Sequence, residues 1–168
     1  MVMRTLLTLV VSLCLAIYAR ADCQSTDGYI ESTQIETNGF TKISVRGTYR
    51  LELIQSPTYK VELSGPPKLL ANLKTKVSSE RLKITPGRCK DTPFTVKIAM
   101  PELDELDLLG HVELDMLNTF TGYKVEVDIS GNSKGNLDFF LELVELDITG
   151  NSNLNIKGGS SHLDIEVL

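Results

Sequence analysis

Four aspartates recur at a regular spacing in the C-terminal half of the chain and could together bind a cation. Each is flanked by two apolar residues, in Leu106-Asp107-Leu108, Val127-Asp128-Ile129, Leu146-Asp147-Ile148 and Leu163-Asp164-Ile165. Because side chains alternate along a strand, apolar neighbours that face a core leave all four carboxylates on the outer face. Carboxylate oxygens are ligands that Ca²⁺ prefers, so these aspartates are candidate calcium ligands.

Two other interpretations of the same aspartates stay open. Like charges on neighbouring strands repel one another, so basic side chains of a protein partner would also stabilise the column. A solvated acidic face, which keeps a strand-rich protein soluble and discourages edge pairing, needs no ligand at all, and we favour it. The aspartate spacing matches no EF-hand loop, and the chain contains no GGxGxD nonapeptide.

Catalytic chemistry has little support in the sequence. His111 and His162 are the only histidines, and neither lies near a G-x-S-x-G signature. The chain contains no P-loop, HExxH or CxxC motif. We therefore predict no catalytic or cofactor-binding residues. The alternative is a polysaccharide lyase or hydrolase, since pairs of carboxylates perform that chemistry, but the absence of Trp removes the usual surface for sugar stacking.

Strands must position these residues, because apolar and polar side chains alternate almost continuously from residue 40 onward. The alternation is clear at Ile43 and Val45, at Phe94, Val96 and Ile98, and again toward the C-terminus. Turn residues such as Ser56-Pro57 and Pro86-Gly87 separate the runs. The one helical candidate is 68–74, which follows a pair of prolines. The pattern predicts an all-β chain.

A repeat of about 20 residues indicates which all-β fold to expect. Gly110, Gly131 and Gly150 follow one another at nearly this interval, and the apolar-Asp-apolar triplets align on them. A repeat with two short strands per period is typical of a parallel β-helix, or solenoid, whereas a β-sandwich has no reason to repeat side chains at a fixed offset. Residues 40–100 repeat less clearly, and we expect irregular rungs or an N-terminal cap there.

The Gly-Asn-Ser sequence after two of the triplets indicates structural turns. We predict that Gly110, Gly131 and Gly150 are turn residues, with Asn132 and Asn151 stacked on successive rungs and joined by a hydrogen bond between their amides. A ligand-binding role for the two asparagines is the alternative. His111 has the same position one rung earlier, and we expect it to interrupt the ladder.

Residues 38–168 resemble a secreted bacterial domain family, the autotransporter-adhesin head or GIN domain. That family has strands of the form F-x-x-I-x-V-x-G, V-x-I-x-Q, Y-x-V-x-V-x-G and L-x-I in this order. The matching segments here are FTKISVRG, LELIQ, YKVELSG and LKI, and the later Asp-Ile-Ser/Thr-Gly motifs resemble the repeated D-x-S-G-A-S of the family. The resemblance implies a right-handed β-helix on a secreted or surface protein, an adhesion-type role, and no catalytic residues.

The N-terminus has the features of a secretory signal peptide. Arg4 precedes an apolar run, 6–18, that is too short to span a bilayer, and Ala19-Arg20-Ala21 has the small-x-small pattern that signal peptidase cleaves. We therefore predict a signal peptide at 1–21, an N-terminal segment at 22–38 and a single domain at 39–168. The expected location is extracellular, periplasmic or at the cell surface.

Two cysteines remain after cleavage, Cys23 and Cys89. In an oxidising compartment they are expected to form one disulfide, which would stabilise the fold by about 4 kcal/mol through the long loop that it closes. Two free thiols are the alternative.

Charge and composition limit the partners that we expect. Removing Arg4 and Arg20 takes the formal net charge from −5 to −7, which disfavours nucleic acid and anionic membranes. An acidic lateral face that binds a protein or a glycan at the cell surface is the function that we predict. The final apolar triplet is followed by no polar cap, so we expect either self-association through the C-terminal edge or a chain that is shortened relative to its gene.

Overall fold

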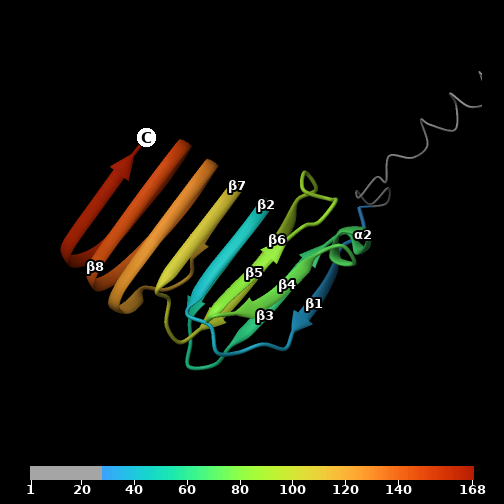
Figure 1. Cartoon of the computed structure of the whole chain (residues 1–168), viewed down its shortest axis with the longest axis horizontal. Helices are drawn as coiled ribbons and strands as arrows, with labels where there is room; N and C mark the ends of the chain where they lie inside the picture. The colour runs from blue at the N-terminus through green and yellow to red at the C-terminus, as the bar shows by residue number, and fades with distance from the viewer. Residues whose placement is uncertain (1–27) are drawn as a thin grey trace, which may run out of the picture.

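The structure, a computed structural model, describes residues 28–168 (Figure 1). The expected signal peptide at 1–21 and Cys23 lie outside these residues. The elements, in chain order, are β1 (Glu31–Ile35), β2 (Lys42–Gln55), β3 (Lys60–Gly65), α2 (Pro67–Leu70), β4 (Lys74–Ser78), β5 (Arg81–Thr85), β6 (Phe94–Met100), β7 (Glu105–Met116) and β8 (Phe120–Val167). The prediction of an all-β chain is confirmed, and the short helix α2 overlaps the segment expected to be helical.

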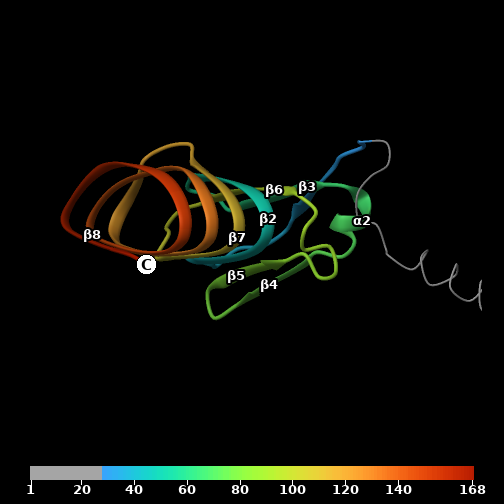
Figure 2. The same ribbon diagram turned by 90° about the horizontal axis from the view of Figure 1, so that it is seen from above.

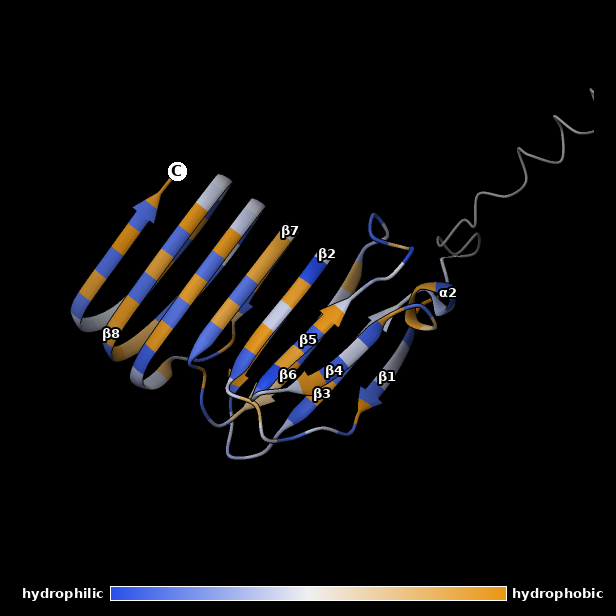
Figure 3. Cartoon of the chain, in the orientation of Figure 1, coloured by the Kyte–Doolittle hydropathy of each residue, from blue (hydrophilic) through white to orange (hydrophobic). Residues whose placement is uncertain are grey.

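Alternation of apolar and polar residues produces these strands, as the bands of hydropathy along each strand in Figure 3 show. In β6, for example, Phe94, Val96 and Ile98 are buried while Lys97 between them is exposed. The strands pair into one mixed sheet that curls around a continuous apolar core. Leu51, Leu108 and Val127 are fully buried in that core, and burial of each such side chain contributes about 1.5–3 kcal/mol.

Residues 105–168, which we call the coil region, consist of β7 and the long strand β8. β7 pairs in parallel with the start of β8, in an unbroken register that aligns the successive repeats and sets Gly110 opposite Gly131. β8 then winds back on itself in successive turns, visible as open loops in Figures 1 and 2. At its end, Leu168 donates to the carbonyl of Ile148 and accepts from the amide of Gly150, which places Leu168 beside Thr149 in a parallel pair.

Residues 28–100, which we call the two-layer region, are joined to the coils through β2. One edge of β2 pairs in parallel with β7 over residues 42–53. On the other edge, residues 42–45 pair with β5 and residues 49–55 pair with β6. β4 extends the β5 side, and β3 and β1 extend the β6 side. The sheet therefore divides into two layers beyond β2, as Figure 2 shows.

For residues 40–100 we expect irregular rungs or an N-terminal cap, and two strands of this range, β3 and β4, do not form parallel rungs. β1, β3 and β4 pair with their neighbours in an antiparallel way. For β4 the connection to β5 gives the physical reason, because Ser79 and Glu80 both have positive φ and form a tight hairpin turn. A strand that returns through so short a turn cannot lie parallel to the strand before it.

Candidate binding surfaces

A column of stacked glycines bends the strands and thereby sets which side chains share a face. Gly110 lies between Gly47 of β2 and Gly131 of β8, and Gly150 packs against Gly131 in turn. Gly131 has φ +124°, and a Cβ added there would overlap the carbonyl oxygen of Gly110. In β2, the residues before Gly47 pair with β5 and the residues after it pair with β6. Because the glycines are stacked, the residues before each glycine lie in the layer of β5 and those after it lie in the layer of β6.

Three of the predicted aspartates form a continuous acidic row, which we define as Asp107, Asp128 and Asp147. Asp107 lies directly opposite Asp128 in the β7–β8 register. Burial raises the pKa of Asp128 above its ordinary value, and the neighbouring carboxylates Glu126, Asp147, Asp107 and Glu105 raise it further. The like-charge repulsion expected from the sequence is therefore present at Asp128.

The fourth predicted aspartate lies outside this row. Because Leu168 pairs with Thr149, counting back along both strands places Glu166 beside Asp147 and Asp164 beside Glu145. The alignment of the triplets placed Asp164 opposite Asp147, and the hydrogen bonds of Leu168 shift the last strand by two positions from that alignment. Among residues 28–168, no group of three or more His, Cys, Asp or Glu side chains has an arrangement that could hold a metal ion.

Two glutamates beside the acidic row, Glu105 and Glu145, have cationic partners, but the row itself has none in the described part of the chain. Glu105 forms ion pairs with Lys42 at 3.7 Å and with Arg81 at 2.6 Å, and Glu145 pairs with Lys124 at 2.7 Å. Among residues 28–168, the side-chain hydrogen bond to the row comes from Ser44, whose hydroxyl donates to Asp107 at 2.8 Å. Most of the negative charge of Asp128 and Asp147 is therefore left uncompensated.

A cluster of lysines lies in the same layer, on strands that come earlier in the chain. Lys76 of β4 lies directly opposite Lys83 of β5, and Lys74 is two positions earlier on β4. All three side chains are exposed, and none forms an ion pair within residues 28–168. We call this cluster the basic patch. Sequence reasoning missed it, although the Lys-x-Lys of β4 and the Arg-x-Lys of β5 are its signal.

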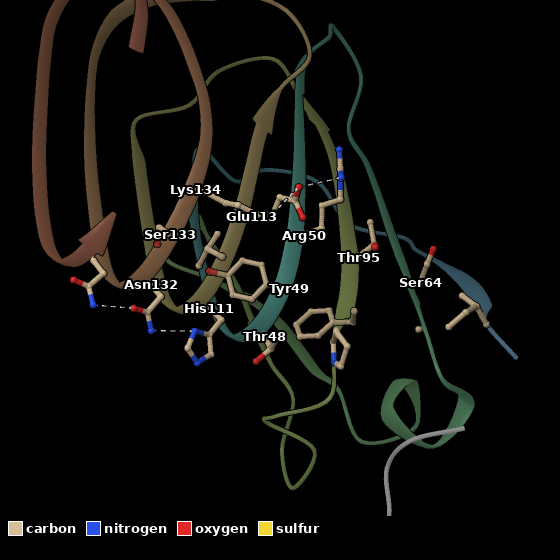
Figure 4. Close-up of a pocket in the computed structure, with 16 residues that line it drawn as sticks. Thr48, Tyr49, Arg50, Ser64, Thr95, His111, Glu113, Asn132, Ser133 and Lys134 are labelled. Atoms are coloured by element: carbon tan, nitrogen blue, oxygen red, sulfur yellow. Dashed lines mark hydrogen bonds and ion pairs between the residues drawn. The ribbon is translucent and has the colours of Figure 1, made fainter. Parts of the chain in front are cut away.

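The predicted hydrogen bond between the repeated asparagines is present. Asn151 donates its amide to Asn132 at 3.3 Å, and Asn132 contacts Nδ1 of His111 at 3.1 Å (Figure 4). His111 therefore continues the ladder, and the expectation that it interrupts the ladder is wrong. A second ladder, which sequence reasoning missed, runs from Asn155 through Asn136 to Asp115. Its signal is that Asn155 follows Asn136 at the same interval at which Asn151 follows Asn132.

The first ladder borders an open groove of about 700 Å³ that crosses β2, β7 and β8. Arg50, Glu113 and Lys134 line the other side, with Glu113 3.4 Å from Arg50 and 3.5 Å from Lys134. Figure 4 shows these side chains in a row apart from the ladder, with Tyr49 between the two. The charged side chains already pair with one another, and most of the surface that lines the groove is apolar, with Ile30, Pro93 and Phe94 among the lining residues.

The histidines form no nucleophile–base arrangement in the described residues. The ring of His111 bonds Asn132, and His162 uses its backbone amide to donate to Ser160. No ring nitrogen of either residue bonds a Ser, Cys, Asp or Glu side chain within residues 28–168. Acid–base catalysis by a histidine needs such a partner or a bound substrate, so nothing in this geometry favours an enzyme.

Cys89 is buried in the connection between β5 and β6 and is disulfide-bonded. Its expected partner, Cys23, lies outside the described residues, so the pairing of Cys23 with Cys89 stays a prediction. The β5–β6 connection links the two layers of the sheet, because β5 and β6 pair with different halves of β2.

Residues 39–168 match the family described as "Putative auto-transporter adhesin, head GIN domain". The resemblance found in the strand motifs is thereby confirmed. No curated protein sequence matches the chain significantly. No helix in the described residues is long and apolar enough to cross a membrane.

Three solved bacterial structures share the fold. A putative lipid binding protein from Parabacteroides distasonis ATCC 8503 has a TM-score of 0.66 at 20% identity, over 84% of this chain and 61% of its own. A putative adhesin from the same strain has a TM-score of 0.58 at 19% identity, over 84% and 71%. A putative adhesin from Bacteroides fragilis NCTC 9343 has a TM-score of 0.53 at 13% identity, over 83% and 93%. This chain thus spans about three fifths of the first protein.

Proposed function

The chain belongs to the family of autotransporter-adhesin head GIN domains, and from that premise we propose that it is a secreted or surface-held binding domain. It performs no reaction of its own and contacts its partner through the acidic row. Membership in an adhesin family supports the binding role. The uncompensated carboxylates of Asp128 and Asp147 are the observation that favours the acidic row as the binding surface.

The coil region is a right-handed parallel β-helix in this proposal. The unbroken parallel register of β7 with β8, the parallel pair at Leu168, and the glycine column support that form. Neighbouring strands in such a stack are about 4.8 Å apart. The acidic row is therefore a rigid line of carboxylates, and their spacing is set by the backbone and not by flexible side chains.

The partner is a protein segment rich in lysine or arginine. Burial and like-charge repulsion both raise the pKa of Asp128, so the ionised row is destabilised in the free protein. A cationic side chain placed against the row removes that repulsion, and the gain appears as binding energy. The flanking pair of Lys124 and Glu145 shows that a lysine reaches this surface with good geometry, at 2.7 Å.

Binding of a lysine-rich peptide to the mature chain, measured by isothermal titration calorimetry, tests the proposal. The double variant Asp128→Asn/Asp147→Asn should bind about tenfold more weakly, since two direct charge contacts are lost. The matched control Glu36→Gln/Asp91→Asn removes the same charge from exposed positions outside the row. Equal weakening in both variants would attribute binding to net charge alone and overturn the assignment to the row. A parallel titration with Ca²⁺ tests the calcium alternative.

A further inference from the structure

The acidic row and the basic patch lie on one continuous outer face, which we call the charged face. It is formed by the strand segments 74–78, 81–85, 42–46, 105–109, 126–130 and 145–149, which follow one another in the sheet from β4 through β5, β2 and β7 to β8. The apolar residues that alternate with the charged ones in these segments, such as Ile43, Ile84 and Leu108, are buried on the opposite side. The charged side chains therefore share one surface.

Charge on this face is segregated by sign. On the β4–β5 side, Lys74, Lys76 and Lys83 have no ion-pair partner within residues 28–168, and Lys76 is directly opposite Lys83. On the β8 side, the carboxylates of the acidic row are equally without cations in the described part of the chain. Each half thus carries like-charge repulsion that only charges from outside the molecule can relieve.

Several charges at the boundary between the halves are already paired. Lys42 of β2 and Arg81 of β5 both pair with Glu105 of β7, and Ser44 bonds Asp107. The unsatisfied cations and the unsatisfied anions consequently lie on either side of a line between β2 and β7. A two-fold axis parallel to that line, between two facing molecules, places each basic half over the acidic half of the other copy.

We propose that the charged face docks a second copy of this chain, with the basic patch of one molecule on the acidic row of the other. The inference rests on the proposed function, because it names the cationic partner of the acidic row. Leu109 supports the arrangement, since it is a large apolar side chain on β7, 40% exposed, next to Arg46 beside the axis. The interface is isologous and closes as a dimer.

The expected size of the interface makes this dimer weak and reversible. Six strand spacings of about 4.8 Å and five residues of about 3.3 Å give a face of roughly 500 Å² on each molecule. Two such faces bury roughly 1,000 Å², which is at the lower limit of specific protein interfaces. Most of the attraction comes from exposed charges, so it falls steeply with salt.

Charge exchange between the two halves provides a direct test. In the variant Lys76→Glu/Lys83→Glu both halves are acidic, and in the variant Asp128→Lys/Asp147→Lys both are basic. Sedimentation velocity of the mature chain at low salt should show a concentration-dependent dimer that dissociates at about 0.5 M salt. Each variant alone should dimerise at least about tenfold more weakly, and the 1:1 mixture should restore a dimer.

Controls separate the proposal from general charge effects and from misfolding. The variant Lys60→Glu/Lys97→Glu reverses two lysines on the opposite layer and should dimerise like the wild type. Restoration of the dimer in the mixture also shows that both charge variants are folded, and thermal melting checks each variant separately.

The outcomes distinguish this inference from the proposed function. A wild-type chain that stays monomeric at low salt, or a mixture that forms no dimer, overturns docking of a second copy. If Lys76→Glu/Lys83→Glu then still binds the lysine-rich peptide as the wild type does, the acidic row serves another cationic partner. If neither dimer nor peptide binding occurs, both proposals fail.

Discussion

The coil region and the two-layer region share one alternation of buried and exposed residues but hold their strands together differently. In the coil region the backbones approach so closely at the glycine column that no Cβ fits between them. In the two-layer region, the β4–β5 hairpin and a disulfide-bonded connection hold the strands. The coil region therefore depends on glycines, which have no Cβ. The two-layer region depends on the covalent links and turns between its strands.

Gly131→Val should give the largest effect and tests the coil side of this comparison. The φ of +124° is strained for any residue with a Cβ, and the side chain would overlap the backbone of Gly110. We expect a loss of more than about 3 kcal/mol in the free energy of unfolding, measured by chemical denaturation. Gly39→Ala is the control, because Gly39 has φ +67° but open space around it. It should lose only about 1 kcal/mol, and equal losses would contradict a packing role for the column.

Cys89→Ser tests the two-layer side. Loss of a disulfide that closes a long loop should lower the free energy of unfolding by about 2–4 kcal/mol. Amide hydrogen exchange in Cys89→Ser should be faster than in the wild type, and the increase should be confined to β5 and β6, which the Cys89 connection joins. If Cys23 is the partner, Cys23→Ser should produce the same loss, and peptide mapping of the oxidised chain should recover the linked pair. An unchanged stability of Cys23→Ser would rule out that pairing.

Asp128→Asn should give the smallest change in the free energy of unfolding. Unlike the two substitutions above, it should increase that free energy. The pKa of Asp128 is raised in the folded state, so its contribution to stability is fully present below the ordinary value of 3.8 and is lost as the pH rises through the raised value. At pH 7 the variant should therefore be more stable than the wild type, by a few tenths to about 1 kcal/mol.

The advantage of Asp128→Asn should disappear as the pH falls below about 4, where the wild-type carboxyl is neutral in both states. Thermal denaturation across this range measures the difference. Asp91→Asn, in an exposed loop, should show no comparable gain at pH 7. A gain that persists at low pH would mean that the amide stabilises the row for a reason other than charge.

The coil region was largely predictable because its signals are local. Alternation identified the strands. The repeat also predicted the register of β7 and β8, because the glycines that align in the sequence, Gly110 and Gly131, are paired in the sheet. The amide bond between Asn132 and Asn151 followed from the same repeat. In each case the partner lies about one turn of the coil away in the sequence.

The position of Asp164 could not be predicted from the same pattern. The expected and the observed registers of the last strand differ by two positions, so both keep Leu163 and Ile165 on the same face of the strand. Hydrophobic patterning cannot distinguish such registers, and the hydrogen bonds of Leu168 decide between them. The basic patch was missed for a related reason, since only pairing through β2 brings β4 and β5 onto the face of β7 and β8.

The stacking of Gly47 on Gly110 has a further consequence for how the two regions coexist. The chain that connects these partners is about three times as long as the chain between Gly110 and Gly131, although both pairs are adjacent in the same column. For a flexible loop, closure entropy grows only with the logarithm of length, so the threefold longer connection costs about 1 kcal/mol more. Four strands, β3 to β6, with the lysines that β4 and β5 carry, can thus be accommodated in the chain between two adjacent strands of the stack at little entropic cost.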